Sequence, residues 1–165
     1  MKSFKLISTF ILFSLMISAC TPSDKQSKSN QSTDSVAQTL SKPLNNLVSI
    51  IEIPVNDFER AIGFYQNILH TKIEEMTMDS LQMGVFHSDS GTVNLLLVKG
   101  KDYKPTTDGA LVYLNGGEDL QLILNNIESN GGKIIVPKTP INPEMGFFAM
   151  FIDTEGNKIG LHSKK

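Results

Sequence analysis

Apolar and polar residues follow a regular order over most of the chain, from about residue 47 to residue 162. A mostly apolar run at 48–55 predicts a strand, and Asp57 shortly after it is suited to cap a helix. Between residues 58 and 69 the apolar side chains recur every three or four positions, which predicts an amphipathic helix. Three further strands are expected after this helix, at 72–78, 81–87 and 92–98.

The same order returns in the second half of this region. A strand is expected at 110–114, and Glu118-Asp119, with Asp119 as the expected cap, opens a helix that runs to Asn130, where Gly131-Gly132 ends it. Three more strands are expected at 133–136, 147–152 and 158–162. Two βαβββ modules, at about 46–99 and 109–163, predict an α+β fold of curved mixed sheets with the helices on one face.

The N-terminal residues follow a different pattern. Two lysines precede an apolar run of about a dozen residues, which is too short to span a bilayer and is typical of a secretory signal. The run ends at Ile17-Ser18-Ala19-Cys20, which resembles the lipobox of bacterial lipoproteins. The resemblance implies a signal peptide at 1–19 and acylation of Cys20, and several acyl chains at ~0.8 kcal/mol per methylene hold a protein on a membrane. The alternative is an ordinary signal peptide with an incidental cysteine.

Residues 20–45 are rich in Ser, Gln, Lys and Thr and predict a flexible tether with a span of roughly 28 Å. The domain at 46–165 is then expected outside the cytoplasm, in the cell envelope, lipid-anchored to a bacterial membrane. Among the 165 residues the formal net charge is −2, so no basic excess indicates nucleic acid as a partner. The single Cys excludes an internal disulfide.

Four landmarks in the domain resemble the vicinal oxygen chelate (VOC) superfamily, which includes glyoxalase I, bleomycin-resistance proteins and extradiol dioxygenases. They are the segment 52–61, the pair Phe64-Tyr65, the segment 131–134 and the segment 153–162. The resemblance implies paired βαβββ modules whose sheets curl around a central cavity. It also implies a homodimer as a common way of closing that cavity.

Metal-dependent members of this superfamily carry four ligands on the first and fourth strands of each module, facing the cavity. The matching positions here are Ile50, Leu95, Leu111 and Gly160, and none of these side chains can coordinate a cation. A register shifted by one residue offers only Asn94. We therefore expect no metal and no other cofactor, and the metal-dependent chemistry of the superfamily is disfavoured.

Strand side chains alternate between faces, so Glu52, Tyr113, Lys158 and His162 are expected to line one pocket, while Ile53 packs under the helices. A carboxylate, a phenol, an ammonium and an imidazole can bind a polar ligand or move a proton. Glu52 and His162 are the candidate catalytic residues. Each of the four also has a structural interpretation, as a solvated or packing side chain.

These patterns favour a binding module that holds a small, partly apolar molecule in a metal-free cavity. An enzyme is the alternative: a metal-free isomerase or lyase that uses Glu52 or His162 as base, or a metal-dependent glyoxalase-like lyase if the strand register is different. A scaffold whose cavity is filled by apolar side chains is a third interpretation. Neither the ligand nor a catalytic activity follows from the residues alone.

Overall fold

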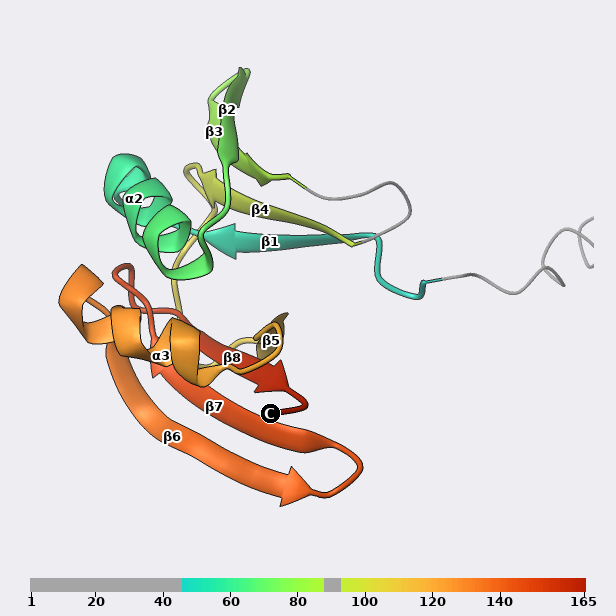
Figure 1. Cartoon of the computed structure of the whole chain (residues 1–165). Coiled ribbons are helices and arrows are strands. Elements are labelled where there is room, and N and C mark those ends of the chain that lie inside the picture. Colours follow the sequence, from blue (N-terminus) through green and yellow to red (C-terminus); the bar gives the residue numbers. More distant parts are fainter. Residues whose placement is uncertain (1–45, 88–92) are drawn as a thin grey trace, which may run out of the picture. The chain divides into compact units, whose positions relative to one another are not determined.

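Two four-stranded sheets, each carrying one α-helix, form the part of the chain that the structure describes (Figure 1). The structure is a computed structural model, and it describes residues 46–87 and 93–165. The expected signal peptide, Cys20 and the tether lie outside these residues. Within them, no helix has the length and apolarity that crossing a membrane requires. The predicted α+β fold of two βαβββ modules is confirmed.

The first module consists of β1 (Ile50–Pro54), α2 (Phe58–Leu69), β2 (Ile73–Met78), β3 (Leu81–Phe86) and β4 (Asn94–Lys99). Its strands lie in the order β1-β4-β3-β2, with β1 parallel to β4 and the other neighbours antiparallel. The helix has the predicted bounds because its cap forms as expected. The Asp57 side chain accepts a hydrogen bond from the backbone N–H of Arg60 at 3.1 Å.

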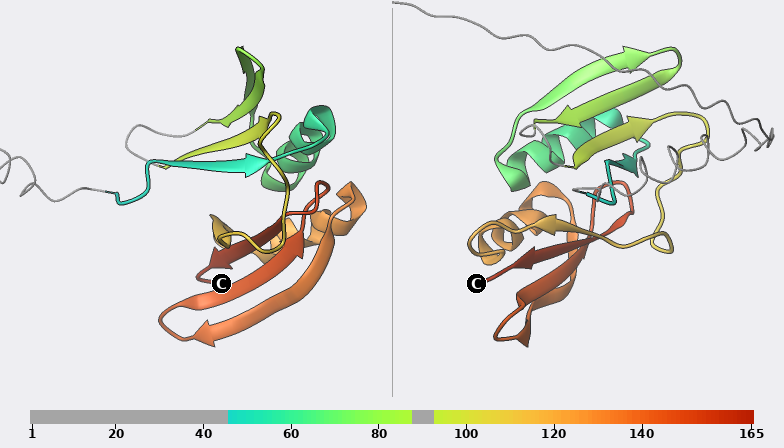
Figure 2. Two further views of the ribbon diagram at one scale, coloured as in Figure 1. Left: turned by 180° about the vertical axis from the view of Figure 1, so that it is seen from behind. Right: turned by 90° about the vertical axis from the view of Figure 1, so that its right-hand side faces the viewer.

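The second module consists of β5 (Val112–Asn115), α3 (Gln121–Ile127), a short 3-10 helix η1 (Glu128–Asn130), β6 (Lys133–Asn142), β7 (Gly146–Ile152) and β8 (Lys158–Ser163). Its strand order, β5-β8-β7-β6, repeats that of the first sheet. Figure 2 shows the two helices as neighbours, in agreement with the contacts between α2 and α3.

Two predictions for the second module were wrong in detail. β6 runs to Asn142, well beyond the expected end at residue 136, although it contains Pro137 and Pro140. Proline is tolerated there because β6 is an edge strand whose pairing with β7 is interrupted by register shifts. Asp119 is also not the helix cap; Leu120 holds that position, and the Asp119 carboxylate binds the Gln121 N–H and the Lys138 ammonium instead.

The apolar core lies between the helices and the sheet faces that they cover. Ile53 and Leu97 are 2% and 0% exposed and pack in this core with the buried side of α2. Leu95 packs against the same core, so the prediction that it faces the cavity was wrong. Parallel pairing with β1 sets this register, because Ile50 lies beside Asn94 and Ile51 beside Leu95. Asn94, not Leu95, therefore shares the free face of the sheet with Ile50.

A buried carboxylate joins the start of α2 to the turn between β7 and β8. Glu155, whose side chain is fully buried, accepts hydrogen bonds from the backbone N–H groups of Asn56 at 3.0 Å and Asp57 at 2.8 Å. It also forms an ion pair with Arg60, at 2.8 Å to Nε and 3.1 Å to Nη2. Desolvation raises the Glu155 pKa, but these donors together outweigh it and hold the pKa below its ordinary value.

Asp153, in the same turn, is a second buried carboxylate that connects the modules. Its Oδ2 accepts from the Tyr65 hydroxyl at 2.8 Å and from Asn157 Nδ2 at 2.9 Å, and its Oδ1 accepts two backbone N–H groups of the turn. Asn157 Nδ2 also donates to the Pro54 carbonyl at 2.9 Å. Burial, followed by the negative charge of Asp153, raises the Tyr65 pKa well above its ordinary value, so this phenol stays protonated.

Candidate functional site

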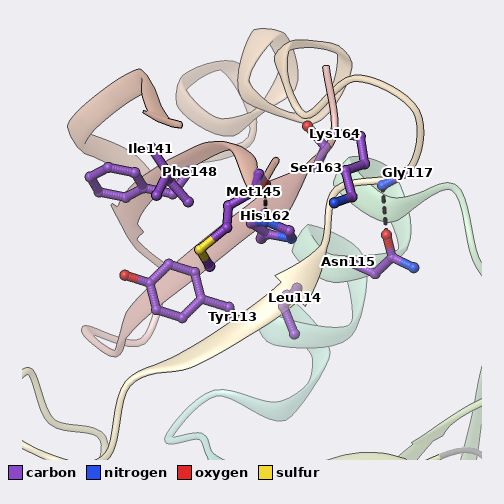
Figure 3. Close-up of a pocket in the computed structure, with 10 residues that line it drawn as sticks. All are labelled: Tyr113, Leu114, Asn115, Gly117, Ile141, Met145, Phe148, His162, Ser163 and Lys164. Carbon is purple, nitrogen blue, oxygen red and sulfur yellow. Dashed lines mark hydrogen bonds between the residues drawn. The ribbon is translucent and has the colours of Figure 1, made fainter. Parts of the chain in front are cut away.

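A pocket of about 830 Å³ lies on the face of the second sheet that is not covered by α3, beside the turn of the β6–β7 hairpin (Figure 3). Ile159 and Leu161 of β8 point into the core under α3, so the alternating residues Gly160 and His162 face the opposite side. The pocket is lined by Tyr113, Leu114, Asn115, Gly117, Ile141, Met145, Phe148, His162, Ser163 and Lys164.

The Tyr113 ring lies directly over Gly160, its partner in the pairing of β5 with β8. A Cβ atom at position 160 would come within 2.5 Å of Tyr113 Cδ1, closer than real Cβ contacts allow. Only glycine therefore lets the aromatic ring rest on the strand. The ring is 45% exposed and forms one wall of the pocket.

His162 is fixed by the β6–β7 hairpin. Its Nε2 lies 2.6 Å from the carbonyl oxygen of Met145, and a carbonyl only accepts, so Nε2 carries the proton. Two further hydrogen bonds fix the hairpin turn itself. Asn142 Oδ1 accepts from the backbone N–H of Met145 at 2.7 Å, and Lys164 donates to the Glu144 carbonyl. Whenever the ring carries a single proton, this leaves Nδ1 as its acceptor nitrogen.

A second groove, of about 610 Å³, runs along β1 and contains Glu52, Tyr113 and Lys158. The Glu52 carboxylate accepts a hydrogen bond at 2.8 Å from the hydroxyl of Tyr103, a residue of the segment between the modules. This bond, followed by desolvation and the Glu52 charge, raises the Tyr103 pKa. The phenol is therefore a hydrogen-bond donor that holds the carboxylate in place.

The structure thus divides the four candidate residues between two pockets. Glu52 and Lys158 line the groove along β1, and His162 lines the pocket on the second sheet. Tyr113 lines both cavities. Sequence reasoning missed Phe148, although it is paired with His162 across β7 and β8 and the alternation of β7 places it on the same face. Tyr103 carried no comparable signal, because it belongs to no strand or helix.

Comparison with known proteins identifies the family. Residues 47–161 match the model of the "Glyoxalase/Bleomycin resistance protein/Dioxygenase superfamily". The chain belongs to this superfamily. A glyoxylase-like domain-containing protein from Didymella fabae is 31% identical over 117 residues, which cover 69% of this chain and 91% of that protein.

Solved structures of the superfamily share the fold at low identity. A glyoxylase/bleomycin resistance protein/dioxygenase domain from Frankia sp. EAN1pec has a TM-score of 0.57 and 14% identity, and the match covers 73% of this chain and 98% of that one. A glyoxalase I variant from Zea mays has a TM-score of 0.54 and 19% identity over 70% of this chain. This chain spans only 45% of the maize chain, about half its length.

The residues present do not fit the metal that the superfamily implies. Ile50 and Leu111 offer no donor atom, and Asn94 is a weak one. At the fourth position, Gly160 has no side chain and lies under the Tyr113 ring. Within the described residues, no group of three or more His, Cys, Asp or Glu side chains is placed to hold a metal ion.

Proposed function

We propose that this superfamily member binds a small, partly apolar molecule in the pocket on its second sheet without a metal ion. The observation that carries this proposal is the Tyr113 ring on Gly160, because an aromatic wall stands where a metal ligand would be needed. A volume of about 830 Å³ suits a ligand of ordinary drug size. Ile141, Met145 and Phe148 provide further apolar walls, and Met adapts well to varied ligand shapes.

Native mass spectrometry of the protein incubated with a fractionated cell extract tests this proposal. We expect a bound small molecule and no stoichiometric metal. Phe148→Ala should abolish the bound mass because it removes an aromatic wall. Leu122→Ala is the matched control, since Leu122 is 66% exposed and does not line this pocket. Near one equivalent of Zn, Ni, Fe or Mn per chain by elemental analysis would overturn the metal-free proposal.

Metal-free catalysis is the second candidate, and the contact between His162 and Met145 favours it. A ring whose Nε2 proton is engaged presents a defined tautomer, which a general base requires. An isomerase or lyase of the glyoxalase type would act on a proton beside a carbonyl group. Turnover of the hemithioacetal of methylglyoxal and glutathione tests this, with His162→Gln as the variant that should remove activity.

We also propose that the protein is anchored in the cell envelope through acylated Cys20, with the domain outside the cytoplasm. The support is the sequence Ile17-Ser18-Ala19-Cys20.

We further propose a homodimer that forms through the free face of the first sheet. There the apolar side chains of Ile50, Met76 and Met78 are about half exposed, at 55%, 49% and 54%. Sedimentation velocity tests the dimer, and a monomer at micromolar concentration would contradict it.

A further inference from the structure

The pocket on the second sheet has a one-sided charge pattern. Among its ten lining residues, Lys164 carries a positive charge, and none is Asp or Glu. The chain as a whole has a formal net charge of −2, so the charge of the pocket is opposite in sign to that of the chain. A cationic pocket on an acidic protein favours a ligand with the opposite sign.

The charge of Lys164 is not neutralised by a carboxylate in the described part of the chain. Its Nζ donates to the backbone carbonyl of Glu144, a neutral acceptor, while the ion pairs there are formed by Arg60 and Lys138. The ammonium therefore keeps both its charge and further N–H donors for another group. Asn115 accepts from the Gly117 N–H with its Oδ1, so its Nδ2 is the atom left to donate.

Apolar and polar groups lie at different ends of this pocket. Figure 3 shows Tyr113, Ile141 and Phe148 on one side and Asn115, Gly117, Ser163 and Lys164 on the other, with His162 between them. Aromatic rings prefer to pack on other aromatic rings in stacked or edge-to-face geometry, a preference that aliphatic chains do not share. The aromatic end therefore favours a flat ring system.

We infer that the pocket binds a planar aromatic anion, with its rings between Tyr113 and Phe148 and its anionic group directed to the Lys164 ammonium and the Asn115 side-chain amide. The inference rests on the proposed small-molecule binding and adds the chemical class of the ligand. A carboxylate or sulfonate accepts charge-assisted hydrogen bonds from these groups, which a neutral amide of the same shape accepts more weakly. A cationic analogue is repelled.

Three probes of one shape test the charge preference: 2-naphthoate, 2-naphthamide and 2-naphthamidine. The protein used is residues 20–165 with Cys20→Ser, which includes every residue that the structure describes. Binding is followed by its ¹H–¹⁵N NMR spectra. We expect the amide signals of Gly117 and Phe148 to shift, and naphthoate to bind roughly three- to tenfold more tightly than naphthamide. Naphthamidine should bind most weakly.

The variants separate charge from packing. Lys164→Gln should bring the naphthoate affinity to within about twofold of the naphthamide affinity and leave naphthamide binding unchanged. Lys133→Gln, which removes the same charge from an exposed position of β6 outside the pocket, should keep the full preference. Octanoate, an anion of similar length without rings, should bind less tightly than naphthoate.

The outcomes distinguish this inference from the proposed function. Equal binding of all three naphthalene probes in the pocket overturns the anion preference and leaves small-molecule binding intact. Octanoate that binds as tightly as naphthoate overturns the aromatic preference. Absence of any pocket shift with every probe up to about 5 mM overturns both the inference and the proposed function.

Discussion

Removal of one hydroxyl group, in Tyr65→Phe, measures what the buried connection between the modules contributes to stability. Tyr65 is 0% exposed, and its hydroxyl donates to Asp153 Oδ2 at 2.8 Å. The ring itself keeps its edge-to-face contacts with Phe64 and Phe86 in the variant. A hydrogen bond to a charged group contributes about 1.5–3 kcal/mol, and Asp153 Oδ2 retains the Asn157 donor, which favours the lower half of that range.

We therefore expect Tyr65→Phe to lower the free energy of unfolding by about 1.5–2 kcal/mol, which is roughly 6–8 °C in Tm for a domain of this size. The assay is thermal and urea denaturation followed by circular dichroism. Tyr113→Phe is the matched control because it also removes one hydroxyl group. Tyr113→Phe should change Tm little, since its ring is half exposed in the pocket. Equal Tm values for the Tyr65 and Tyr113 variants would refute the assigned role of Asp153.

The remaining predictions concern the loss of stability at low pH, the side chains on the two faces of β1, and the lipid anchor. The Glu155 pKa is lowered in the folded state, so its stabilisation is present above the ordinary carboxyl pKa and is lost as the pH falls through the folded value; Glu155→Gln should flatten the loss of Tm below about pH 4.5. Ile53→Ala should cost about 2–5 kcal/mol in urea denaturation, whereas Glu52→Gln should leave the stability nearly unchanged. Equal costs would mean that Glu52 is a structural residue. Cys20→Ala should leave unprocessed or soluble protein without lipid, and a variant that fractionates like wild type would contradict the anchor.

The order of elements was predictable because the local patterns are strong. The amphipathic spacing and the Asp57 cap are both contained in one segment, and α2 has the predicted bounds. β6 was predicted too short because proline ordinarily ends a strand, and only the strand order shows that β6 is at an edge. Periodicity therefore identified which elements form, and the neighbours of each strand decided how far it extends.

The register of β4 was not predictable from the sequence in the same way. Counting forward from a turn assumes that no residue is inserted before the strand, and a shift of one residue moves every side chain to the other face. Pairing with β1 places Leu95 in the core and Asn94 on the free face. The conclusion about metal ligands survives this correction because neither residue type is a strong donor.

The buried carboxylates were missed for a different reason. Residues 153–157 have the composition of an ordinary hairpin turn, and nothing local indicates that Glu155 binds backbone groups about a hundred positions earlier in the chain. Buried carboxylates need donors to offset their desolvation, and here the donors come from the other module. Such long-range polar contacts leave no periodic signal in a sequence.

The division of the candidate residues between two pockets follows from Tyr113 itself. If position 160 carried a side chain, its Cβ atom would lie 2.5 Å from Tyr113 Cδ1, so the ring could not rest on β8. The Tyr113 ring lines both cavities and forms a wall that they share. Glu52 therefore lines one cavity and His162 the other. A ligand held by Lys164 beside His162 would then be bound by one module alone, and substitutions at Glu52 should leave its affinity unchanged. An effect of Glu52→Gln on that affinity would show that the Tyr113 ring moves aside and that the two cavities join when the ligand binds.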